Sequence, residues 1–176
     1  IQSKTKMFSR AASRLVSRAF ASSTGVVSEV EKQTAVLAVK KACHLCLSVQ
    51  SGSMEKATLS KTDASPVTVA DFAVQALIID TISRVFPSDK FVAEEEAKDL
   101  RDSSHNHLLG QVVAEINKVN HIQPLSTCRI LEALDLGAYD PAQPLDDPQR
   151  YWVLDPIDGT KGFVRREQSA VALGLV

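Results

Sequence analysis

The chain has 176 residues and a mass of 19.1 kDa, a size that suits about one globular domain. Apolar residues make up 44% of it and charged residues 23%, proportions that exclude a disordered or fibrous protein. No apolar run approaches the roughly 18 residues of a membrane helix, and three cysteines cannot close a disulfide framework. A membrane-spanning protein is therefore excluded, and a reducing compartment is favoured.

The net charge of −1 is unevenly distributed along the chain. Residues 1–28 contain five basic residues and no acid, so the rest of the chain carries the entire negative excess. This acidic part offers no basic stripe for a phosphate backbone, which argues against binding to DNA or RNA.

Residues 1–28 have the composition of an organellar targeting peptide, most clearly from Met7 onward. They are rich in Arg and Ser, and Arg10, Arg14 and Arg18 would share one face of a helix. This pattern predicts a mitochondrial or plastid transit peptide, followed by a folded domain over residues 29–176. The alternative is a disordered basic tail on a cytoplasmic protein.

A first long helix is predicted after the basic segment. Ser28 and Glu31 form an S-x-x-E capping box, and the helical pattern continues to about Gln50. Its apolar residues cover most of the surface, which indicates packing on more than one side. A polar loop over residues 51–65 follows.

A second helix is predicted over Val69–Phe86. Thr68 and Asp71 form a cap pair at its start, and Pro87 ends it. The pattern gives it one inner apolar stripe, formed by Phe72, Ala76, Ile79, Ile82 and Phe86.

Shorter elements are predicted for the remainder of the chain. In order, these are a strand at 91–93, helices around 108–119 and 127–136, a proline-rich surface loop at 138–149, and strands at 151–154 and 169–176.

The segment after strand 151–154 carries the strongest chemical signal. It reads as a tight turn, Asp155-Pro156-Ile157-Asp158-Gly159-Thr160. Such a turn can aim both aspartates and the Ile157 carbonyl at one point, a set of hard oxygen donors suited to Mg²⁺ rather than Zn²⁺. Backbone N–H groups near Thr160 would suit a phosphate. The alternative is an Asx-turn, in which both aspartates accept hydrogen bonds from nearby N–H groups.

Two further acidic clusters accompany this turn. Glu94, Glu95 and Glu96 follow directly after the strand at 91–93, and Asp71 lies in the first turn of the second helix. The glutamates either form a solvated loop edge or contribute a ligand to a cation that relieves their repulsion. Asp71 by itself needs no role beyond that of a capping acid.

Three motifs, taken together and in order, resemble the signatures of a known enzyme family. They are Lys61–Asp71, Val92–Glu95 and Trp152–Phe163. They look like those of the lithium-sensitive, magnesium-dependent phosphatases of the inositol monophosphatase superfamily. The Lys161-Gly162-Phe163 run, with Leu125–Thr127 and Gln168–Val171, is similar to the branch of 3′(2′),5′-bisphosphate nucleotidases.

The resemblance implies an α+β fold, namely the N-terminal half of a layered α/β/α/β/α sandwich without its C-terminal half. It also implies two or three Mg²⁺ ions in a complete enzyme. Glu94, Asp155 and the Ile157 carbonyl would hold one ion. Asp155 and Asp158 would help to hold a second.

The resemblance also implies catalytic roles for residues around these ions. Asp71 and Thr160 would orient and deprotonate the attacking water, with Glu95 close by. The backbone of Gly159 and Thr160 would contact the phosphate of the substrate.

The implied reaction is hydrolysis of the 3′-phosphate of adenosine 3′,5′-bisphosphate, giving AMP and phosphate, in sulfur assimilation or nucleotide turnover. 3′-Phosphoadenosine 5′-phosphosulfate is a further candidate substrate. The partner would therefore be a small phosphate ester, not a nucleic acid or a membrane. Two alternatives stay open: an inositol phosphate 1-phosphatase, and a truncated fragment that hydrolyses nothing.

A few residues depart from the family pattern or suggest other chemistry. Arg166 stands where the family usually has Gly, and Ser169 where it usually has an aromatic residue. The C-x-x-C pair of Cys43 and Cys46 is interpreted as packed thiols rather than a redox or metal site, because no second pair accompanies it. His105 and its neighbour His107 are interpreted as surface residues.

Overall fold

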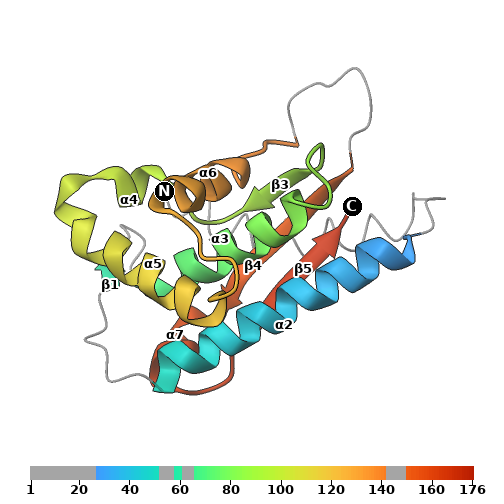
Figure 1. Ribbon diagram of the computed structural model, residues 1–176. Helices are drawn as coiled ribbons and strands as arrows, with labels where there is room; N and C mark the ends of the chain where they lie inside the picture. Colours follow the sequence, from blue (N-terminus) through green and yellow to red (C-terminus); the bar gives the residue numbers. More distant parts are fainter. Residues whose placement is uncertain (1–26, 52–57, 61–65, 142–149) are drawn as a thin grey trace.

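The computed structural model describes residues 27–51, 58–60, 66–141 and 150–176 (Figure 1). The predicted targeting peptide therefore lies outside the described residues, apart from its last two positions. So does most of each polar loop predicted at 51–65 and 138–149. None of the helices in the described ranges is both long and apolar enough to cross a membrane.

Helices and short strands alternate along the chain, which confirms the predicted α+β class. The elements are α2 (Glu29–Ser51), β1 (Thr58–Ser60), β2 (Pro66–Thr68), α3 (Val69–Ser83), β3 (Lys90–Ala93), α4 (Lys98–Arg101), the 3-10 helix η1 (Ser103–His105), α5 (Asn106–Val119), α6 (Thr127–Leu136), β4 (Tyr151–Asp158), α7 (Thr160–Arg165) and β5 (Ala170–Leu175). β1 and β2 form an antiparallel pair, and the other three strands form a sheet in the order β3-β4-β5.

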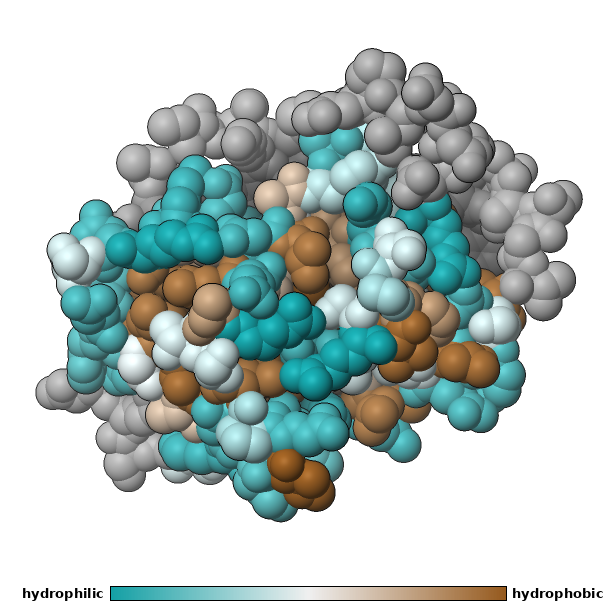
Figure 2. All heavy atoms as spheres, turned by 45° about the horizontal axis from the view of Figure 1, so that its top comes forward, coloured by the Kyte–Doolittle hydropathy of each residue, from teal (hydrophilic) through white to brown (hydrophobic). Residues whose placement is uncertain are grey.

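The capping box at the start of α2 is confirmed. The Ser28 N–H donates to the Glu31 carboxylate at 2.6 Å, and the Glu31 N–H donates to the Ser28 hydroxyl at 3.3 Å. The helix packs against α3, α5 and β5. Its wide apolar surface is only partly used in these contacts, because large side chains remain exposed at Val30, Val36, Leu37 and Leu47. Figure 2 shows apolar residues on one face of the molecule in small groups separated by hydrophilic ones.

Helix α3 occupies the middle of the molecule, with α2 on one side and α4 to α6 on the other (Figure 1). The predicted inner stripe lies in the core, but the other faces of the helix are covered as well, because every residue of Val69–Ser83 is buried. The helix contacts α2, α5, α6 and β4, so no face is left for solvent. It ends three residues earlier than predicted, and Phe86 lies beyond its end, between two turns.

The central strand β4 is twice as long as predicted. Strand pairing continues through the expected turn to Asp158, so the start of that turn at Asp155 is wrong. Asp155 pairs with Ala172 of β5, whereas Asp158 pairs with Ala170, so the register shifts between the two aspartates. A bulge of this kind bends a strand without ending it, and the two acids consequently lie on either side of the bend.

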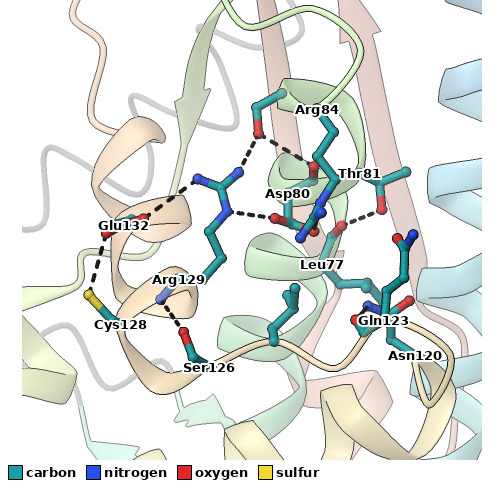
Figure 3. A network of polar contacts seen from close by, with 12 residues as sticks. Leu77, Asp80, Thr81, Arg84, Asn120, Gln123, Ser126, Cys128, Arg129 and Glu132 are labelled. Atoms are coloured by element: carbon teal, nitrogen blue, oxygen red, sulfur yellow. Dashed lines mark hydrogen bonds and ion pairs between the residues drawn. The ribbon is translucent and has the colours of Figure 1, made fainter.

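A buried ionic network joins α3 to α6 (Figure 3). Asp80 is 3% exposed, and its carboxylate accepts from Arg129 Nε at 2.7 Å and from Arg84 Nε at 2.8 Å. Arg129 also donates to the Ser83 hydroxyl at 2.9 Å. Ser126 caps α6 by accepting the Arg129 backbone N–H at 3.2 Å, which fixes the point from which the arginine reaches across.

Replacing Arg129 with Ala is expected to lower the free energy of unfolding by about 2–3 kcal/mol, because the buried Asp80 loses one of its two guanidinium partners. Urea unfolding measures the loss. The control is Arg101→Ala, which removes an exposed pair with Asp135 at 2.6 Å and is expected to cost less than about 1 kcal/mol. Equal losses in the two variants would show that the Asp80 network does not stabilise the fold.

Candidate functional site

The parallel pairing of β3 with β4 brings Glu94 and Asp155 together. Ala93 is opposite Leu154 in the register, so the next residue of each strand emerges at the same edge of the sheet. Glu94 and Asp155 are therefore neighbours, although about 60 positions separate them in the sequence.

Asp155 lies in a strongly acidic environment. Burial raises the pKa of its carboxyl group to about 7, and the negative charges of Glu94, Asp158 and Asp71 add to the shift in that order. A hydrogen bond with the backbone of Ile157 opposes it. Four carboxylates from the β3 end, β4 and α3 thus share one electrostatic field. The bond to Ile157 is the local contact that the Asx-turn alternative predicts.

Asp71 comes to this region on the first turn of α3. Its side chain is 4% exposed, and α3 packs directly on β4. The predicted cap pair with Thr68 lies outside the side chains that the structure describes. A carboxylate buried this deeply beside other acids is more than a surface capping group.

The three glutamates after β3 differ in their surroundings. Glu95 is 4% exposed, so the solvated-edge alternative is wrong for it. Glu96 is half-buried and forms an ion pair with Lys98 at 2.5 Å, as expected at a loop edge. Adjacent acids of this short segment therefore lie in different environments.

The segment after Asp158 turns sharply into α7. Gly159 adopts a left-handed conformation with φ of 83°, and its carbonyl accepts the Phe163 N–H at 3.0 Å. The Thr160 hydroxyl donates to the Ile157 carbonyl at 3.1 Å. The threonine and this carbonyl are therefore in direct contact.

The donor chemistry of these residues fits Mg²⁺. Carboxylates and a backbone carbonyl are hard oxygen ligands, and a divalent cation would relieve the repulsion that, after burial, contributes to the raised pKa of Asp155. In the described ranges, no group of three or more Asp, Glu, His or Cys side chains is arranged to hold a metal ion. The convergence of Glu94, Asp155 and Asp158 on one ion stays a prediction.

Two other sequence features are resolved near the site. Arg166 adopts a left-handed conformation with φ of 60°, which glycine adopts more readily, and its guanidinium donates to the Gln50 carbonyl at 3.0 Å. Cys43 and Cys46 are free thiols, and only Cys46 is packed as predicted. Burial, followed by the charges of Cys43 and Asp71, raises the pKa of Cys46 to about 12, so this thiol stays protonated at neutral pH.

The sequence pattern gave no indication of Gln75. It lies fully buried in α3 and forms two hydrogen bonds with the backbone of Glu95. The helix also contains Asp71, Asp80, Thr81 and Ser83, so one further polar residue in its sequence does not stand out.

The chain belongs to the inositol monophosphatase family, whose model matches residues 24–176. This finding confirms the resemblance and agrees with the fold described above.

Relatives in several organisms are similar to the chain. A protein of Arabidopsis thaliana, provisionally named a mitochondrial 3′(2′),5′-bisphosphate nucleotidase, is 40% identical over 149 residues, which cover 82% of this chain and 37% of the relative. The 3′(2′),5′-bisphosphate nucleotidase of Dictyostelium discoideum is 37% identical over 82% of this chain and 42% of its own length. That of Emericella nidulans is 41% identical over 84% and 43%. The chain thus spans about two fifths of the length of these relatives.

Proposed function

We propose that the chain is the N-terminal part of a Mg²⁺-dependent phosphatase that converts adenosine 3′,5′-bisphosphate to AMP and phosphate. The main support is the placement of Glu94 beside Asp155, in a field shared with Asp71 and Asp158. The names of the relatives support a bisphosphate nucleotide as the substrate. 3′-Phosphoadenosine 5′-phosphosulfate carries the same 3′-phosphate and is a second candidate.

The metal ligands would come from two strands. Glu94, Asp155 and the Ile157 carbonyl would hold one Mg²⁺, and Asp155 and Asp158 would help to hold another. Bound Mg²⁺ neutralises charge on the transferring phosphoryl group and lowers the pKa of bound water. The partly buried position of Asp155 strengthens its attraction for a cation, because water screens the interaction less there than at the surface.

Other residues of the site would act on the attacking water. Asp71 and Thr160 would orient it and remove its proton, with Glu95 close by. The contact of Thr160 with the Ile157 carbonyl supports this arrangement, since it places the hydroxyl next to a proposed metal ligand. The backbone of Gly159 and Thr160, at the start of α7, would contact the phosphate.

One observation favours a second candidate function, metal binding without hydrolysis. This chain spans only about two fifths of the length of its relatives. A chain of this extent would bind the metal without hydrolysing anything if residues beyond this span complete the site. Inositol phosphates are the alternative substrates within the same family.

The proposed location is the mitochondrion or a plastid. The basic, acid-free composition of residues 1–28 supports it, as does the word mitochondrial in the name of one relative. Fusing residues 1–28 to a fluorescent protein tests this location, and fluorescence in the cytosol would contradict it.

Phosphate release from adenosine 3′,5′-bisphosphate tests the activity. We expect release that requires Mg²⁺ and is inhibited by Li⁺, measured for this chain and for any longer product of the same gene. Release by the longer product alone would identify the chain as an inactive part. Release from inositol 1,4-bisphosphate, with none from the nucleotide, would contradict the proposed substrate.

A further inference from the structure

A buried carboxamide clamps the backbone of the acidic segment that follows β3. None of the surface of Gln75 is exposed. Its Nε2 donates to the Glu95 carbonyl at 2.7 Å, and its Oε1 accepts the Glu95 backbone N–H at 2.8 Å. This double hydrogen bond resembles the pairing of two peptide groups, so it fixes both the position and the orientation of the segment.

The clamp connects two parts of the candidate site. Asp71 lies one helical turn before Gln75 on α3. The pairing of β3 with β4 ends at Ala93, one residue before Glu94. The contacts of Gln75 therefore continue the support of this backbone beyond the point where the strand ladder stops. They tie Glu94 and Glu95 to the helix that carries Asp71.

Gly137 leaves the space that this side chain occupies. A Cβ at this position would lie 2.9 Å from Gln75 Nε2 and 3.1 Å from the Ala93 Cβ. The Gly137 carbonyl also accepts the Ala93 N–H at 2.9 Å, so the backbone here cannot retreat without breaking that bond. A residue without a side chain is required for the carboxamide to keep its place.

We propose that Gln75 is a positioning residue that holds Glu94 and Glu95 at the distance from Asp155 and Asp71 that the site needs. It acts through the two glutamates. The inference rests on the proposed function, because the acids are positioned for a metal ion and a water molecule.

Two variants of the full chain test the clamp from opposite sides. Gln75→Met retains the length of the side chain and removes both hydrogen bonds. Gly137→Ala retains Gln75 and pushes its amide away from Glu95. The control is Thr81→Val, which removes a buried hydroxyl of the same helix that donates to the Leu77 carbonyl at 2.7 Å.

The first readout is amide hydrogen exchange at Glu95, followed by NMR. We expect exchange about tenfold faster in both clamp variants and unchanged in the control, because one backbone hydrogen bond is lost. The second readout is the dissociation constant for Mn²⁺, followed by electron paramagnetic resonance. We expect it to rise about tenfold in the clamp variants and not in the control.

The outcomes separate this inference from the proposed function. Unchanged Glu95 exchange in a folded Gln75→Met or Gly137→Ala variant overturns the clamp, and so does unchanged Mn²⁺ affinity when the wild-type chain binds Mn²⁺. A wild-type chain that binds no Mn²⁺ contradicts the proposed metal site, while the exchange rate at Glu95 still decides whether Gln75 holds the segment.

Discussion

Replacing Asp155 with Asn is expected to stabilise the metal-free chain while abolishing its affinity for Mg²⁺. Burial keeps this carboxylate away from water, and the like charges beside it add to the effect, so that its pKa is raised to about 7. A neutral amide of the same shape removes this repulsion. The expected gain is about 1–2 kcal/mol in the free energy of unfolding at pH 8, after allowance for the water that still screens a partly exposed group.

The pH dependence of this gain follows from the direction of the shift. The unfolded chain ionises Asp155 near its ordinary pKa, whereas the folded chain does so only near pH 7. The wild-type chain therefore loses stability as the pH rises between these values, and the loss is complete above pH 7. The variant should gain nothing below about pH 4 and the full amount at pH 8.

Urea unfolding in EDTA, repeated across this pH range, measures the effect. Asp158→Asn is the matched control, because its side chain is exposed on the same strand and should change stability less. With Mg²⁺ present the wild-type chain should become more stable, and the Asp155 variant should not. A variant that is destabilised in EDTA at pH 8 would show that the Asp155 carboxylate supports the fold instead of straining it.

Replacing Gly162 with Ala is expected to cost about 3 kcal/mol, the largest loss foreseen for an added methyl group among the glycines that the structure describes. A Cβ at this position would lie 2.3 Å from the Gln168 carbonyl oxygen. The clash is with backbone, and the Glu167 N–H is already bonded to the Gly162 carbonyl at 2.7 Å. The segment between α7 and β5 must therefore shift, and the pairing of Asp158 with Ala170 shifts with it.

The control for this change is Gly110→Ala. Gly110 lies in α5, and apart from its two neighbours and the backbone of its own helix nothing lies within 4 Å of the position that an added methyl group would take. Alanine should therefore stabilise the helix by about 0.5–1 kcal/mol. Thermal unfolding of both variants measures these two changes in stability, which are expected to have opposite signs. Equal stabilities for Gly162→Ala and the wild-type chain would show that the α7–β5 connection adjusts without cost.

Local signals in the sequence were sufficient for the elements that depend on neighbours along the chain. The Ser28 capping box, the start of α6 after Ser126 and the position of β3 are all confirmed. In each case the determining contacts span three or four residues, or a short run of apolar residues.

Contacts between distant segments could not be predicted in the same way. The burial of all sides of α3 depends on three other helices and a strand, and no periodicity within α3 itself reveals that number of neighbours. The extension of β4 past Asp155 depends on its partner β5, which holds the strand beyond a Pro and a bulge. Propensity alone favoured a turn there.

The candidate site divides along the same line. The Asp155 to Thr160 motif and the glutamates were identified from residue type and spacing, while the neighbouring positions of Glu94 and Asp155 needed the parallel register. Gln75 was missed because its partner is the backbone of a residue 20 positions away. Every residue type offers the same backbone groups, so the amino acid at position 95 does not indicate that its backbone is bound by a side chain.

A crystal of the full chain soaked in Mn²⁺ tests the metal site most directly, because the anomalous signal locates the ion without assumptions. The proposed site predicts a peak within about 2.2 Å of oxygens from Glu94, Asp155 and the Ile157 carbonyl, a distance typical of such ligands. A fully occupied peak elsewhere, with these oxygens too far apart to share an ion, would contradict it.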